Sequence, residues 1–110
     1  MNATLLAALI AVESGGRDNA IGDRHLSQPA VGALQIRQPA LDDANRIIRT
    51  NLTIMQMTNR SIAIKVADAY LSHYGKGKSL HDLARIWNGG PSGHRRPSTL
   101  SYLNKIKRYL

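Results

Sequence analysis

The sequence contains no cysteine and no phenylalanine, and its 110 residues include only one tryptophan and four tyrosines. Without cysteine, neither disulfide bonds nor a thiolate zinc site can hold a small fold together, so side-chain packing must stabilise it. Apolar residues make up 43% of the chain, which is enough for one modest hydrophobic core. We therefore expect a single domain that spans residues 1–110.

Long apolar runs are also missing. The stretch Leu5–Val12 is far too short to cross a bilayer, so we expect no membrane span. No Lys or Arg precedes this stretch and no small-residue cleavage site follows it, so it does not resemble a signal peptide. We interpret it as a buried helix.

Acidic residues are scarce, and the seven Asp and Glu against fifteen Lys and Arg give a formal net charge of +8. Such an excess favours an anionic partner, and nucleic acid and bacterial wall polymers both qualify. A basic face kept for solubility explains the charge equally well. The last third of the chain is distinctly positive through Lys76, Lys78, Arg85, Arg95, Arg96, Lys105, Lys107 and Arg108.

Helical periodicity dominates the chain. Apolar residues over positions 5–12 follow a helical spacing that Gly15 and Gly16 interrupt, so Glu13 falls at a helix C-terminus, where the negative end of the helix dipole disfavours a carboxylate. Residues 17–38 are irregular and punctuated by Gly22, Pro29 and Gly32, which predicts loops or a small β-hairpin.

Four more helices are expected. Pro39 can open one through Ile48, another runs from about Asn59 to His73 with Gly75 as its cap, and Ser79 with Asp82 predicts a short helix over 80–87. Ser98 or Thr99 can cap a last helix, which carries Leu100, Leu103, Ile106 and Leu110. The predicted fold is mainly α with one small irregular β-hairpin or loop insertion.

Two carboxyl groups can break a glycosidic bond when one stays protonated and donates its proton to the leaving oxygen. The other acts on the opposite face of the sugar. Glu13 and Asp23 are the natural pair. Desolvation and the helix C-terminus would both raise the pKa of Glu13, whereas Asp23 lies in a polar loop that contains glycine. An exposed helix-end carboxylate and a turn-forming aspartate remain the ordinary alternatives.

Five ordered segments resemble the soluble lytic transglycosylases and goose-type lysozymes of the lysozyme superfamily. That family has Glu-Ser at a helix end, then a Gly-x-Leu/Met-Gln-Ile/Leu segment, an Ala-Tyr-Asn-x-Gly element and a closing Tyr-Val-x-Lys-Val helix. The corresponding segments here are Glu13-Ser14-Gly15-Gly16, Ala20-Ile21-Gly22-Asp23, Val31-Gly32-Ala33-Leu34-Gln35-Ile36, Ile86-Trp87-Asn88-Gly89-Gly90-Pro91 and Ser101-Tyr102-Leu103-Asn104-Lys105-Ile106. The resemblance implies a lysozyme-like helical domain that cleaves peptidoglycan glycan strands at the β-1,4 bond between N-acetylmuramic acid and N-acetylglucosamine.

The resemblance also implies site residues. Glu13 would be the general acid, Ser14 would hydrogen-bond sugar or carboxylate, and Gln35 would line the cleft. Tryptophan replaces the family's usual tyrosine at Trp87, where an indole can still stack on a pyranose ring. Asn88 would suit an N-acetyl group, and Tyr102 is the remaining phenol expected near the glutamate.

Asp23 leaves the type of reaction open. Many lytic transglycosylases have no second catalytic carboxylate and form an anhydro product, while an Asp before the Gly-x-x-Gln-Ile segment resembles invertebrate-type and goose-type lysozymes. Asp23 is therefore a candidate nucleophile or water-activating base. No cofactor is expected, and His25, His73, His81 and His94 lack the spacing of a metal site.

Two other functions compete with glycan cleavage. A basic nucleic-acid-binding helical module would explain the charge, but the aromatic residues are not interleaved with the basic ones as a stacking platform requires, so nucleic acid is not expected. A degenerate relative that binds peptidoglycan without cutting it is disfavoured because Glu13 is present. We expect a monomer that acts on the anionic bacterial wall. Its localisation is undetermined. An endolysin encoded by a phage, or a domain excised from a longer protein, would suit the missing signal peptide.

Overall fold

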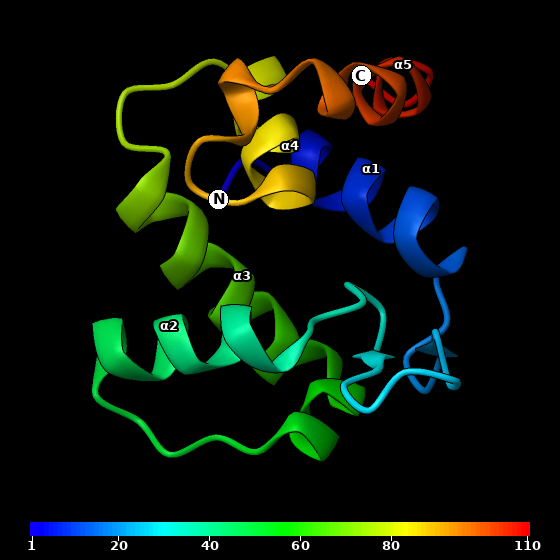
Figure 1. Cartoon of the computed structure of the whole chain (residues 1–110), viewed down its shortest axis with the longest axis vertical. Coiled ribbons are helices and arrows are strands. Elements are labelled where there is room, and N and C mark those ends of the chain that lie inside the picture. The colour runs from blue at the N-terminus through cyan, green and yellow to red at the C-terminus, as the bar shows by residue number, and fades with distance from the viewer.

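Five α-helices and one small antiparallel sheet make up the fold in the computed structural model, which describes all 110 residues (Figure 1). The helices are α1 (Ala3–Ser14), α2 (Gln38–Ile48), α3 (Arg60–Tyr74), α4 (Leu80–Gly89) and α5 (Leu100–Lys107). The strands are β1 (Ile21–Gly22) and β2 (Ala30–Val31), and short 3₁₀ segments lie at η1 (Ile54–Thr58), η2 (Gly93–Arg95) and η3 (Pro97–Thr99). The prediction of a mainly helical fold is confirmed.

Helix α1 ends at the glycine that the sequence indicates, and it begins after a side-chain cap. The Asn2 side chain accepts a hydrogen bond from the Leu5 amide at 3.0 Å and caps the first turn. Gly15 takes a left-handed conformation with φ of 63°, and its amide donates to the Ala11 carbonyl, which closes the helix. Glu13 therefore lies in the last turn of α1.

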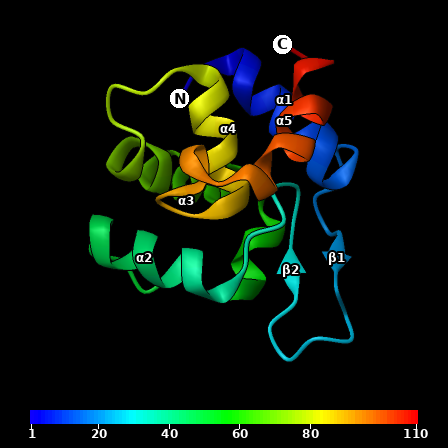
Figure 2. The same cartoon turned by 45° about the horizontal axis from the view of Figure 1, so that its top comes forward.

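The small β-hairpin of the irregular region is also confirmed. Ile21 pairs with Val31 and Gly22 with Ala30, and the loop between the strands projects away from the helices (Figure 2). The Gly32 amide donates to the Ala20 carbonyl at 2.8 Å, which fixes the base of the hairpin. The hairpin thus carries its loop residues out beside the end of α1.

Helices α3 and α4 begin close to their predicted first residues, and side-chain caps precede both. Asn59 accepts a hydrogen bond from the Ile62 amide, and Ser79 accepts one from the Asp82 amide at 3.2 Å. Helix α4 continues to Gly89, two residues beyond the predicted end, so Asn88 belongs to the helix and not to the following loop.

The start of α5 differs from the prediction. Thr99 precedes the helix, but its hydroxyl is buried within hydrogen-bonding distance of the Gly93 and Arg96 carbonyls and accepts from Arg85 Nε, so it does not cap the helix. The expected apolar face is also partly wrong, because Leu100 and Leu110 are 47% and 40% exposed. Leu103 and Ile106 alone turn that face toward the core.

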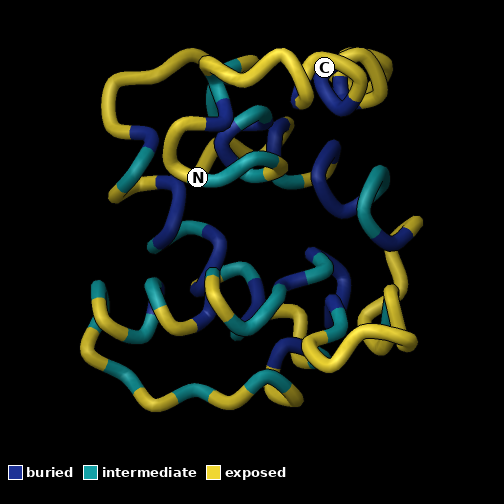
Figure 3. The backbone as a smooth tube through the Cα atoms, viewed as in Figure 1, coloured by how far each residue is buried: buried dark blue, intermediate teal, exposed yellow.

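The hydrophobic core is continuous through all five helices and contains 20 buried residues, among them Leu5, Leu41, Val66, Ile86 and Ile106. Helix α4 contacts α1, α3 and α5, whereas α2 packs against α3. Many residues of α1, α3 and α4 are accordingly buried, whereas the outer loops are exposed (Figure 3). Helices α1, α4 and α5 thus lie on one side of the molecule and α2 with the hairpin on the other, with α3 joining them (Figure 1).

None of the helices combines the length and the apolar character needed to cross a membrane.

Candidate active site

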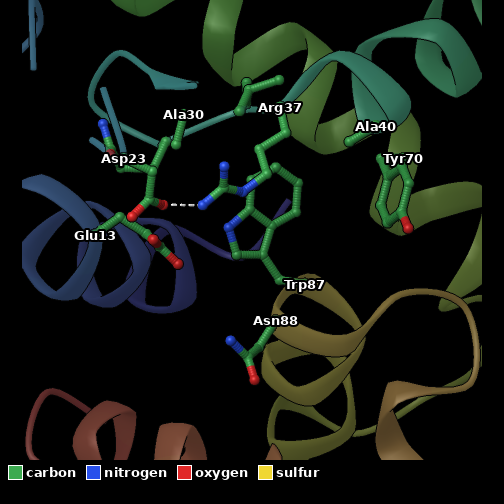
Figure 4. Close-up of a pocket in the computed structure, with 10 residues that line it drawn as sticks. Glu13, Asp23, Ala30, Arg37, Ala40, Tyr70, Trp87 and Asn88 are labelled. Atoms are coloured by element: carbon green, nitrogen blue, oxygen red, sulfur yellow. Dashed lines mark hydrogen bonds and ion pairs between the residues drawn. The ribbon is translucent and has the colours of Figure 1, made fainter. Parts of the chain in front are cut away.

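A cleft of about 240 Å³ opens between the two sides of the molecule. Its ten lining residues come from α1, the hairpin region, α2, α3 and α4, so segments far apart in the sequence meet here (Figure 4). These residues are Glu13, Asp23, Ala30, Gln35, Ile36, Arg37, Ala40, Tyr70, Trp87 and Asn88. Five of the seven residues predicted for the site therefore line one cavity.

Glu13 enters this cleft from the last turn of α1 and is half-buried. The Tyr102 hydroxyl donates a hydrogen bond of 2.6 Å to Glu13 Oε2. Tyr102 is 8% exposed and comes from α5, so the contact joins the first and last helices. One carboxylate oxygen is thereby held, and the side chain has a defined orientation.

Burial raises the pKa of Glu13 above its ordinary value, because desolvation disfavours the charged carboxylate. The hydrogen bond from Tyr102 and the charges of Arg37 and Lys105 act in the opposite direction without cancelling the effect. Burial also raises the pKa of the Tyr102 phenol, and the adjacent Glu13 adds to this shift. Tyr102 therefore remains a hydrogen-bond donor throughout the pH range in which Glu13 titrates.

Asp23 reaches the same cleft from the hairpin loop. It has a left-handed backbone with φ of 55°, a conformation that aspartate tolerates better than most residues. Its Oδ2 atom accepts from Arg37 Nη2 in an ion pair, shown as the dashed line in Figure 4. Arg37 also donates to the Gln28 carbonyl at 3.1 Å, which ties the hairpin loop to the start of α2. The Oδ1 atom of Asp23 has no protein partner.

Gln35 is fixed by the hairpin itself. It has a φ of 50°, and its Nε2 atom donates to the carbonyls of Ala20 and Gly32 at 3.2 and 3.0 Å. The Oε1 atom lies against Gly22, where an added Cβ would approach it to 2.2 Å. The glycine is therefore needed for this close approach.

Trp87 and Asn88 lie next to each other on α4 and form the opposite wall (Figure 4). The Trp87 indole packs edge-on against Tyr70, with ring centroids 5.8 Å apart. Burial, together with the charges of Asp43 and Tyr74, raises the pKa of Tyr70 to about 12, so its phenol stays neutral. Asn88 is exposed at the rim with no protein hydrogen bond from its amide.

Ser14 does not reach the cleft, contrary to the prediction. It is 4% exposed, and its hydroxyl donates to the Ile10 carbonyl while accepting from the amides of Gly16 and Arg17. These contacts satisfy backbone groups at the end of α1. Ser14 is a structural residue that holds the turn after Glu13, and it is unavailable to a sugar.

The sequence prediction did not include Arg37 or Tyr70. Arg37 directly follows the Gln35-Ile36 segment and precedes α2, so its nearness to the motif was the available signal. Tyr70 lies on the buried face of α3, and the periodicity that marks it as core does not show that one edge meets a cavity. No group of three or more His, Asp or Glu side chains is placed to hold a metal ion.

The fold and the cleft together define a class of protein: a lysozyme-like enzyme with a half-buried carboxyl group in a groove between two sides of a helical domain. The whole chain, residues 1–110, matches the transglycosylase SLT domain family. The chain belongs to this family, and it is a peptidoglycan-cleaving enzyme of the glycoside hydrolase or lytic transglycosylase type. None of the curated protein sequences matches the chain significantly.

Solved lysozyme structures share the fold. A chain in the complex of Aeromonas hydrophila PliI with Meretrix lusoria lysozyme superposes with a TM-score of 0.84 at 24% identity, covering 98% of this chain and 89% of that one. The inhibitor-bound lysozyme of Meretrix lusoria gives a TM-score of 0.83 at 24% identity with the same coverage. The Tapes japonica lysozyme gives 0.79 at 25% identity, covering 97% of this chain and 89% of that one.

Proposed function

We propose that this protein cleaves the β-1,4 bond between N-acetylmuramic acid and N-acetylglucosamine, with Glu13 as the general acid and residues 1–110 acting as one catalytic domain. The observation that carries the proposal is the position of Glu13, half-buried in the cleft and bound by Tyr102 at 2.6 Å. A general acid must hold its proton near the working pH and release it to the leaving oxygen. Burial shifts the pKa of Glu13 upward, which is the direction that the first requirement needs.

The Tyr102 contact supports a specific proton position. Because Tyr102 donates to Oε2, that oxygen acts as an acceptor, and the acidic proton belongs on Oε1. In the proposed reaction this proton moves to the glycosidic oxygen as the bond to the sugar's anomeric carbon breaks. The resulting Glu13 carboxylate is stabilised by the Tyr102 hydroxyl and by the nearby charge of Arg37.

Asp23 is proposed to assist hydrolysis by activating water or by attacking the anomeric carbon. Its free Oδ1 and its place in the same cavity as Glu13 support this assignment. The likeness to the Tapes japonica lysozyme supports the hydrolytic reaction, while the family's name favours a lytic one, in which the muramoyl 6-hydroxyl replaces water. The two reactions give products that differ in mass by one water.

Gln35, Trp87 and Asn88 are proposed to bind the glycan. The exposed part of the Trp87 ring offers a flat apolar surface of the kind that pyranose rings stack on. The amide of Asn88 can donate and accept at once, which suits an N-acetyl group, and Gln35 lines the same cleft. The charge of +8 supports adsorption to the anionic wall and an endolysin-like, antimicrobial action on intact bacteria.

Digestion of purified peptidoglycan tests this proposal. The wild-type protein should release glycan fragments whose mass shows a reducing muramoyl end, and an anhydro end would show the lytic reaction instead. Glu13→Gln keeps the shape and the Tyr102 contact but removes the proton, so the rate should fall by about 10² to 10⁴. Asp42→Asn, which removes an exposed carboxylate of α2 outside the cleft, should leave the rate unchanged. An active Glu13→Gln variant would refute the assignment.

A further inference from the structure

A second cavity, of about 430 Å³, meets the cleft at Glu13 and Gln35. Its volume is within the roughly 300 to 1,000 Å³ that is usual for small-molecule sites. The other lining residues are mostly polar and come from the turn after α1, the first strand of the hairpin and the loop that follows it: Arg17, Asn19, Ala20, Ile21, Gly22 and Arg24. Glu13 thus lies between an aromatic cavity and a basic one.

Glu13 is the one carboxyl group that lines the second cavity, and one of its oxygens is already bound by Tyr102. Asp18 and Asp23 are the two aspartates of this region, and they pair with Arg60 and Arg37. Arg24 makes no ion pair or hydrogen bond. Arg17 uses its Nε atom to donate to the Ser14 carbonyl at 2.9 Å, which anchors the side chain and leaves both terminal nitrogens free.

Two unpaired guanidinium groups beside a polar cavity fit a carboxylate, because the guanidinium fork matches the two oxygens of that group. The glycan proposed as substrate carries such groups. Each muramoyl unit has a lactyl ether that ends in a carboxylate or in a peptide with carboxylates of its own. A glycan of N-acetylglucosamine alone has neither.

We propose that the second cavity binds a carboxylate of the muramoyl substituent through Arg17 and Arg24, and that this contact makes the enzyme prefer muramoyl glycans over uncharged ones. The inference rests on the proposed function, since it assigns part of the substrate to one side of the proposed acid. Asn19 can add a hydrogen bond from the same wall. Trp87 and Asn88 remain available to the sugar rings on the other side of Glu13.

Binding to the Glu13→Gln protein tests the proposal without turnover. The ligands are three forms of one tetrasaccharide of alternating N-acetylglucosamine and N-acetylmuramic acid: free lactyl carboxylates, the methylamide of those carboxylates, and a peptide-bearing form. Calorimetry should show the free acid or the peptide-bearing form binding about fivefold to tenfold more tightly than the methylamide. Whichever of the two binds more tightly identifies the source of the carboxylate.

Variants of the two arginines, made in the same background, assign the preference to the cavity. Arg24→Gln should reduce it and Arg17→Gln/Arg24→Gln should abolish it, while Arg24→Lys should keep part of it by keeping the charge. Arg49→Gln is the matched control, because Arg49 ends α2 and does not line the cavity. The carboxylate site would be overturned if neither the free acid nor the peptide-bearing form binds more tightly than the methylamide, or if the preference survives the double substitution.

Cleavage of peptidoglycan by the unmodified protein separates the two proposals. If the wild-type protein cleaves peptidoglycan but shows no preference for carboxylate ligands, only the second cavity is misassigned. If the wild-type protein cleaves no glycan, the proposed function fails, and the assignment of the second cavity fails with it.

Discussion

The hydroxyl of Tyr102 lies 2.6 Å from Glu13 Oε2 and joins two residues that are 89 positions apart in the chain. This contact ties the last helix to the end of the first. It also favours the ionised carboxylate, whereas burial of Glu13 favours the protonated form more strongly. The proton affinity of Glu13 is therefore set by two opposing effects that a single substitution can separate.

Tyr102→Phe removes the hydrogen bond and keeps the ring. Because that bond lowers the pKa of Glu13, its loss should raise the pKa further and move the basic limb of the kcat/KM profile to higher pH. The buried carboxyl oxygen also loses its partner, so the free energy of unfolding should fall by about 1 kcal/mol. Tyr109→Phe removes a phenol from a residue that is 52% exposed and should change neither quantity. A basic limb that stays in place or moves to lower pH would contradict this account of the contact.

Asp23→Asn tests the second carboxylate. If Asp23 activates water or attacks the sugar, hydrolysis should fall by about 10² or more, as is typical when a catalytic base is lost. The free energy of unfolding should change by less than about 0.5 kcal/mol, because the ion pair with Arg37 is well exposed.

Asp18→Asn is the matched control for Asp23. It removes another exposed aspartate that is paired with an arginine, in the segment between α1 and β1. Products of reduced mass, with anhydro ends and a rate that Asp23→Asn leaves unchanged, would show that Asp23 only shapes the turn.

Glu13→Gln should stabilise the fold near neutral pH. The folded state holds the Glu13 proton more tightly than the unfolded chain does, so the stability that this group contributes is complete below its unfolded pKa and is lost as the pH rises through the folded value. Above the unfolded pKa, the wild-type protein must either bury a carboxylate or take up a proton when it folds, and the glutamine variant does neither. Thermal unfolding should therefore give a higher Tm for Glu13→Gln at pH 7, with the difference shrinking toward pH 4. A variant that is less stable at pH 7 would argue against a desolvated Glu13.

Cleavage of intact walls should weaken as salt is added. The last third of the chain carries exposed basic residues, and attraction between exposed charges is screened beyond about 8 Å at physiological ionic strength. Substituting Lys107 and Arg108 by Gln should lower both the rate at low salt and its dependence on salt. Walls stripped of their anionic polymers serve as the control, because their cleavage should respond less to salt. Equal salt responses on the two substrates would remove this function of the charge.

The sequence predicts the elements of the fold because local signals mark them. Asn2 and Gly15 bound α1, and Asn59 and Ser79 begin the next helices with side-chain caps. Thr99 shows the limit of this reasoning, since a threonine before an apolar run looks like a cap until tertiary contacts with Arg85 and the Gly93 carbonyl take its hydroxyl.

The site is predicted only in part. Motif order identifies the cleft residues, but it cannot show which atoms are already occupied. Ser14 stands next to Glu13 in sequence, yet the helix turns its hydroxyl inward to three backbone groups. Arg37 enters the cleft because the hairpin loop folds back on the start of α2, a contact with no periodic signature. Contacts between residues far apart in the sequence therefore determine which side chains reach the cleft, and local sequence patterns do not show these contacts.

The proton affinity of Glu13 tests the central claim most directly. Glu13 is the sole glutamate in the sequence, so its side-chain carboxyl signal in a glutamate-labelled ¹³C NMR titration is unambiguous. This account predicts a pKa above the ordinary glutamate value, together with a basic limb of kcat/KM on soluble muramoyl oligosaccharides at the same pH. A Glu13 carboxyl that titrates at or below its ordinary value, or a pH–rate profile that does not follow its titration, would contradict it.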